Sequence, residues 1–165
     1  TISETAPADT VVKLLNDYFD LMVNEIINHG GYIDKFIGDA IMAVFKDEFH
    51  LDKAIDASLS VRSKIEELPS VSNIFSFTPK VSIGINTGEM ISGNIGSASL
   101  RRLDYTVIGD TVNTAQRLQS AAKENQIIIN ENTYQRVKDS FNCRMVGEVT
   151  LKNKAKTMTI YEIID

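Results

Sequence analysis

The chain has 165 residues, 43% of them hydrophobic and 24% charged, which is enough for one globular domain with a full core. The net charge of −5 argues against a nucleic-acid-binding surface, although a few local cations could still hold a nucleotide. The single cysteine, Cys143, excludes an internal disulfide framework and a cysteine-rich zinc site, and fits a reducing, cytoplasmic setting. No apolar run approaches the roughly 20 residues of a membrane-spanning helix, and no secretory signal opens the chain.

The first half of the chain predicts two helices separated by a hairpin. A broad apolar face at helical spacing begins near Pro7 and stops at the glycine pair at 30–31. Two apolar, strand-like runs then meet at a Gly-Asp step at 38–39. A second helix is expected over 51–68, ended by Pro69.

The second half predicts mostly strands, with two helices among them. We expect a second hairpin, in which 80–85 and 89–95 pair across the turn at 86–88. Alternation of helices and hairpins predicts one α+β domain over residues 1–165, with helices packed on a mostly antiparallel sheet. The remaining expected elements are strands over 105–108, 126–129, 143–150 and 157–164, and helices over 111–123 and 131–138.

The first motif, at 34–45, reads DKFIGDAIMAVF. Gly38 at the first central position of a two-residue loop suits a type II′ turn, which would lift the Asp39 carboxylate above the sheet. Mg²⁺ prefers oxygen ligands and takes few of them from protein when it also binds substrate phosphates. Lys35 lies on a strand that otherwise looks buried, where lysine is uncommon; the alternative is a strand-edge lysine with its head in water.

The second motif, at 101–118, reads RRLDYTVIGDTVNTAQRL and predicts a strand, a tight turn and a helix. Asn113 and Arg117 are four residues apart and therefore share one helix face near its N-terminal end. A helix start beside a cation suits phosphate charge. The alternative makes Asp110 a helix N-cap, Asn113 a polar residue of the first turn and Arg117 a solvated side chain.

Together the two motifs resemble the catalytic domain of class III nucleotidyl cyclases, in order along the chain from Thr1 to Asp165. The resemblance implies a ferredoxin-like βααββαβ core. It also implies an adenylate cyclase, which converts ATP to 3′,5′-cyclic AMP and pyrophosphate by in-line attack of the ribose 3′-hydroxyl on the α-phosphate. The family uses two divalent ions per site, Mg²⁺ or Mn²⁺.

By resemblance, Asp39 is the second of two metal-binding aspartates. The first belongs to a strand upstream of a Ser-Glu pair that Ser3-Glu4 matches, so we expect an N-terminally truncated domain from a longer protein. A trimmed chain, a disordered start and a non-catalytic remnant are all compatible with this departure, and the intact second motif favours the first two.

The resemblance also gives roles to Asn113, which orients the ribose, and Arg117, which stabilises the transition state. Lys35 and Thr106 match the pair that reads the base. Lysine can only donate, which suits N1 of adenine, and threonine can accept from the N6 amine. Guanylate cyclases of the family typically carry glutamate in place of the lysine, so ATP is the expected substrate.

Two further cations match triphosphate-binding positions of the family. Lys154 resembles the second lysine of a Lys-Gly-Lys step, in which Asn153 here replaces the glycine, and Lys152 is a possible substitute. Arg101 matches the other cation, and Arg102 beside it could be confused with it. For both arginines, a solvated loop position is the alternative.

The family builds each site from two subunits, so the resemblance implies a head-to-tail homodimer with shared active sites. By analogy the domain itself contacts neither membrane nor nucleic acid, while the parent protein is expected to carry sensor or membrane segments. A guanylate cyclase and a non-catalytic dimerisation or nucleotide-binding module are the competing functions.

Overall fold

A computed structural model describes residues 8–68, 80–97, 102–150 and 156–165. The chain forms two compact units, Thr1–Val81 and Ser82–Asp165. Within the described ranges, no helix combines the length and apolar character that crossing a membrane requires.

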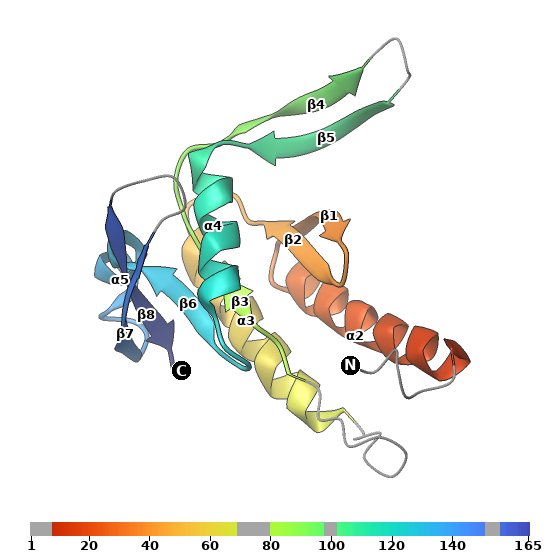
Figure 1. Cartoon of the computed structure of the whole chain (residues 1–165), viewed down its shortest axis with the longest axis horizontal. Coiled ribbons are helices and arrows are strands. Elements are labelled where there is room, and N and C mark those ends of the chain that lie inside the picture. The colour runs from red at the N-terminus through yellow and green to blue at the C-terminus, as the bar shows by residue number, and fades with distance from the viewer. Residues whose placement is uncertain (1–7, 69–79, 98–101, 151–155) are drawn as a thin grey trace. The chain divides into compact units, whose positions relative to one another are not determined.

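In the first unit, two helices pack together and form the apolar core. They are α2 (Ala8–Asn28) and α3 (His50–Glu67), both shown in Figure 1. Most of the buried residues of α3 are three or four positions apart, so one face of the helix lies inward. The buried apolar residues of α3 are Leu51, Ile55, Ala57, Val61 and Ile65.

A buried carboxylate ties α2 to α3. Glu25 of α2 is 5% exposed and accepts a hydrogen bond of 2.6 Å from the Ser60 hydroxyl. Lys64 donates to the other carboxylate oxygen. The hydrogen bonds from Lys64 and Ser60 hold the pKa of Glu25 below its ordinary value, against the opposing effect of burial.

The predicted hairpin is present. β1 (Tyr32–Ile37) pairs antiparallel with β2 (Ala40–Val44), and the two-residue turn between them holds Gly38 and Asp39. Gly38 has φ +59° and Asp39 is not among the residues with positive φ, as a type II′ turn requires. The strand register shifts between Ile33 and Lys35, so Asp34 is an extra residue in a β-bulge.

The second unit contains a four-stranded sheet in the order β3-β6-β8-β7. β3 (Ile83–Gly84) runs parallel to β6 (Ile127–Asn130), whereas β8 (Thr157–Ile163) is antiparallel to both β6 and β7 (Cys143–Thr150). The three isoleucines of β6 are fully buried. Ile128 forms a core with Leu118 of α4 (Asp110–Ala121) and Ile160 of β8. The short helix α5 (Glu131–Val137) follows β6 directly.

The predicted pairing of 80–85 with 89–95 is wrong. β4 (Ile91–Ser97) pairs antiparallel with β5 (Arg102–Ile108), and this two-stranded ribbon extends from the start of α4 (Figure 1). The edge of β3 pairs with β6 instead. The Asn86 side chain donates to the Thr111 carbonyl oxygen of α4 over 3.0 Å, which directs the chain after β3 toward the helix rather than back along the strand.

The other predicted elements are confirmed, with β5 starting three residues earlier than expected. The chain is thus α+β with mostly antiparallel strand pairs among the described residues, as its alternating pattern predicted. Pro69, expected to end α3, lies outside the described residues.

Candidate active site

α4 carries two predicted site residues, and a close backbone contact fixes the helix against β3. A Cβ atom added to Gly84 would lie 2.2 Å from the Gln119 backbone nitrogen and 2.6 Å from the Ala115 carbonyl oxygen. No side chain fits at those distances, so glycine is needed for the helix to approach the strand this closely. The contact lies at the middle of α4, one turn or less from Arg117.

The start of α4 is held by a chain of hydrogen bonds that the sequence analysis missed. The Thr111 hydroxyl donates to the Glu89 carbonyl oxygen over 2.8 Å, and Asn86 binds the Thr111 carbonyl. Asn130 in turn donates to the Asn86 side-chain oxygen over 3.1 Å. The helix N-cap is Gly109, so the alternative in which Asp110 caps the helix is wrong.

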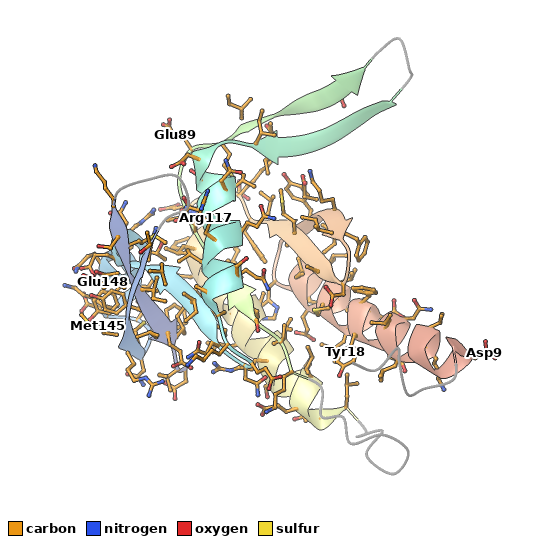
Figure 2. All side chains as sticks on the ribbon, viewed as in Figure 1. Asp9, Tyr18, Glu89, Arg117, Met145 and Glu148 are labelled. Carbon is orange, nitrogen blue, oxygen red and sulfur yellow. The ribbon has the colours of Figure 1, made fainter. Side chains whose placement is uncertain are left out.

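Asn113 and Arg117 line one pocket, with a volume of about 520 Å³. The pocket is lined by α4 and by the C-terminal end of β7. Figure 2 labels Arg117 on α4 and Glu148, which precedes the lining residues Val149 and Thr150 in the sequence. The structure therefore brings these two predicted residues together on one polar concave surface. The other lining residues are Gln116, Ser120, Ala121, Val149 and Thr150.

The additional lining residues are not among the predicted site residues of either motif. Gln116 and Ser120 stand three residues after Asn113 and Arg117 respectively, so the helical spacing alone could have found them. Thr150 could not have been found that way. It lies on β7, which pairs with β8, and both strands come well after α4 in the sequence.

Lys35 and Asp39 lie on the β1–β2 hairpin of the first unit. The Lys35 ammonium is 3.6 Å from a carboxylate oxygen of Asp34, and the lysine side chain is 43% exposed. Asp39 is exposed at the hairpin tip. The hairpin thus presents one cation and one carboxylate to the surroundings.

Three predicted residues have no described side chain. Thr106 lies on β5 opposite Gly93 of β4, a placement that rests on the backbone alone. Arg101 and Lys154 lie outside the described residues. Their triphosphate roles remain predictions.

The exposed carboxylate of Asp39 has the chemistry of a magnesium ligand. Mg²⁺ is commonly held by one or two carboxylates together with substrate phosphates and water, so one such side chain fits as part of its ligand set. No cluster of three or more histidine, cysteine, aspartate or glutamate side chains suited to a metal occurs within the described part of the chain.

A profile of the adenylate and guanylate cyclase catalytic domain family matches residues 1–165. The chain belongs to this family. The match spans both units, and it confirms the resemblance drawn from the two motifs. The cyclase domain is also similar to the terminal-differentiation-specific adenylate cyclase of Dictyostelium discoideum, with 36% identity over 99% of the chain and 8% of that relative.

Two solved structures show the same α+β fold. The adenylyl cyclase CyaB from P. aeruginosa superposes with a TM-score of 0.89 at 33% identity, covering 99% of this chain and 87% of that one. The guanylyl cyclase Cya2 superposes with a TM-score of 0.84 at 31% identity, covering 98% of this chain and 83% of that one. The cyclase domain spans between 8% and 34% of the length of the first curated relatives it matches.

Proposed function

We propose that residues 1–165 form a single adenylate cyclase catalytic domain that converts ATP to 3′,5′-cyclic AMP and pyrophosphate. The ribose O3′ forms a bond to the α-phosphorus, the bond from that phosphorus to the bridging oxygen breaks, and pyrophosphate leaves in line. The hydroxyl proton passes to solvent. The protein has to position the reacting atoms and offset the charge on the phosphates.

The observation that carries this proposal is the pocket in which Asn113 and Arg117 lie side by side. Arg117 would direct its guanidinium donors at the α-phosphate as charge builds on its oxygens. Asn113, one turn earlier, would bind the ribose so that O3′ faces the phosphorus. Thr150 and Ser120 add hydroxyl groups to the same surface.

Asp39 would hold the divalent ions, together with a second carboxylate that the family carries upstream. Two Mg²⁺ or Mn²⁺ ions, when bound, supply activation of the hydroxyl and neutralisation of phosphate charge. The family assignment and the exposed position of Asp39 at the hairpin tip support this role.

In this proposal, Lys35 and Thr106 select the nucleotide base. Lys35 would donate to adenine N1, and the Thr106 hydroxyl would accept from the N6 amine. The similarity to the guanylyl cyclase Cya2 makes GTP the second candidate substrate. Lysine disfavours binding of guanine, because guanine N1 carries a hydrogen-bond donor and lysine can only donate. Arg101 and Lys154 would bind the triphosphate.

The proposal includes a head-to-tail homodimer in the cytoplasm, with sites shared between the two subunits. Large apolar side chains at the base of the β4–β5 ribbon support a protein contact there. Met90 is 37% exposed, Ile91 68% and Ile108 44%. A dilution series of specific activity tests it, because a shared site loses activity as the dimer dissociates.

The decisive experiment incubates the purified protein with ATP or GTP, with Mg²⁺ and then Mn²⁺, and identifies the products. Cyclic AMP from ATP, with little cyclic GMP from GTP, is the expected result. Cyclic GMP as the main product would favour the guanylate cyclase, and a rise in GTP use on Lys35→Glu would place the difference at the base readers. No product from either nucleotide would favour the non-catalytic module.

Arg117→Ala tests the pocket directly. We expect kcat to fall by about 10²–10³-fold, the usual cost of one lost charge-stabilising donor. Arg136→Ala is the matched control, since Arg136 is exposed on α5 and does not line the pocket. Unchanged kcat in Arg117→Ala would contradict the role given to the pocket.

A further inference from the structure

The β-bulge in β1 places two side chains of opposite charge together. In a regular strand, neighbouring residues point to opposite faces of the sheet. Here Ile33 pairs with Ala43 and Lys35 pairs with Met42, which leaves Asp34 as the extra residue between them. Bulges recur next to active sites, where they change the direction of a side chain.

The contact that results is asymmetric. An Asp34 oxygen lies 3.6 Å from the Lys35 ammonium, and the Asp34 side chain is 0% exposed whereas that of Lys35 is 43% exposed. The carboxylate is therefore the fixed partner and the lysine head is the part that solvent or a ligand can reach. The distance is that of an ion pair rather than a direct hydrogen bond.

We propose that Asp34 is a positioning residue that orients Lys35 toward the purine base and so contributes to nucleotide selectivity. The inference rests on the proposed function, because it takes Lys35 as the reader of adenine N1. Lysine has four flexible side-chain bonds and a strongly hydrated head, so an unanchored ammonium points in many directions. The buried carboxylate restricts that freedom and leaves the ammonium hydrogens on the far side free to donate.

The role predicts a loss of selectivity rather than a uniform loss of activity. The probes are ATP and its 1-deaza analogue, in which a C–H group replaces the N1 acceptor. A charge-assisted hydrogen bond contributes about 1.5–3 kcal/mol, so the wild-type protein should prefer ATP over the analogue by about 10–100-fold in kcat/KM. In Asp34→Asn we expect this ratio to fall by about fivefold or more, since the lysine is no longer held.

Partial misfolding does not obscure the result. The ratio of two kcat/KM values measured on one sample is independent of how much of the protein is active. Should Asp34→Asn give no measurable product, Asp34→Ser removes the carboxylate with a smaller side chain and is read in the same way. Asp56→Asn, an exposed change on α3, is the matched control and should keep the wild-type ratio.

The comparison with Lys35→Met separates this inference from the proposed function. If Lys35→Met loses the preference for ATP and Asp34→Asn or Asp34→Ser retains it in full, Asp34 does not position the lysine. If Lys35→Met itself keeps the preference, the base-reading role of Lys35 fails. If both variants lose it and the double variant loses no more than Lys35→Met alone, the two residues act through one contact.

Discussion

The candidate residues stand in two different physical settings, on helix α4 and on the β1–β2 hairpin. α4 is fixed at its middle by the contact with Gly84 and at its start by hydrogen bonds from Asn86 and Thr111. Among the residues that the structure describes, the hairpin forms a sheet of two strands, and its tip is exposed. It contacts α2 through the edge-to-face rings of Phe19 and Phe36, whose centres are 5.4 Å apart.

The difference shows how rigidity is distributed over the proposed reaction. A transition-state contact has to be accurate to a fraction of an ångström, and Arg117 has a support that leaves little room for movement. The proposed metal ligand, Asp39, and the proposed base reader, Lys35, lie at the tip and on the first strand of a hairpin whose accuracy depends on its own turn and bulge. Changes in α4 should therefore alter stability and rate together, whereas changes in the hairpin should alter chemistry at unchanged stability.

Asp39→Asn should give the largest effect and tests the hairpin side of the comparison. The substitution removes the charge of a proposed metal ligand. Because a bound metal stabilises the charge of the transition state by several kcal/mol, kcat/KM should fall by at least about a hundredfold. The urea midpoint of unfolding should stay unchanged, because Asp39 is exposed. Asp47→Asn is the control, since asparagine tolerates its φ of +83°. Equal activity of Asp39→Asn and wild type in Mg²⁺ would remove the metal role.

Gly84→Ala tests the helix side. The added Cβ would overlap the α4 backbone, and such overpacking costs about 1–3 kcal/mol or more in free energy of unfolding. Activity should fall as well, because α4 has to shift. Gly93→Ala is the control, since a Cβ there would have no atom within 4 Å. Urea denaturation compares the two, and equal midpoints would contradict the tight contact.

Glu25→Gln tests the contact between α2 and α3 in the unit that carries the hairpin. The free energy of unfolding should fall by about 2 kcal/mol, the contribution of a hydrogen bond to a charged group. The folded-state pKa of Glu25 is lowered, so its contribution is present above the ordinary glutamate pKa of 4.5 and is lost as the pH falls below it. The free energies of unfolding of the wild type and Glu25→Gln should therefore become equal at acidic pH. Glu67→Gln, an exposed change on α3, should match the wild type at every pH.

Asn86→Ala should have the smallest effect, about 1 kcal/mol of unfolding free energy from its lost hydrogen bonds. If these bonds set the direction of α4, kcat should fall several-fold while KM changes less. Asn28→Ala, at the exposed end of α2, is the control for stability. A variant with wild-type kcat would show that the Gly84 contact and the Thr111–Glu89 hydrogen bond position the helix without Asn86.

The elements were predictable where the signal is local. Apolar spacing located α2 and α3, the motif at 101–118 located α4, and the Gly38-Asp39 step identified a hairpin turn that the structure confirms. The pairing of β3 was not predictable in this way, because its partner, β6, lies more than forty residues further along the chain. Two neighbouring apolar runs resemble a hairpin until a distant strand competes for the same edge.

The site follows the same division. Asn113 and Arg117 were recognisable from their four-residue spacing and the motif around them, and the structure places both on one pocket. Asn86 and Thr150 depend on contacts between distant segments, and Asp34 depends on a register shift that no residue pattern revealed. The sequence thus indicated the residues proposed to touch substrate, and left out those that hold them in place.

The strand order of the second unit also has a consequence for biosynthesis. β3 leaves the ribosome long before β6, and the pocket wall at Val149 and Thr150 is paired with the first residues of β8. A growing chain therefore cannot complete this wall of the pocket until Thr157 and Met158 have emerged, whereas the hairpin of the first unit can close as soon as β2 is available. Ribosome-bound chains arrested after β3 has emerged and before β6 has emerged would contain a closed hairpin and a β3 without its partner.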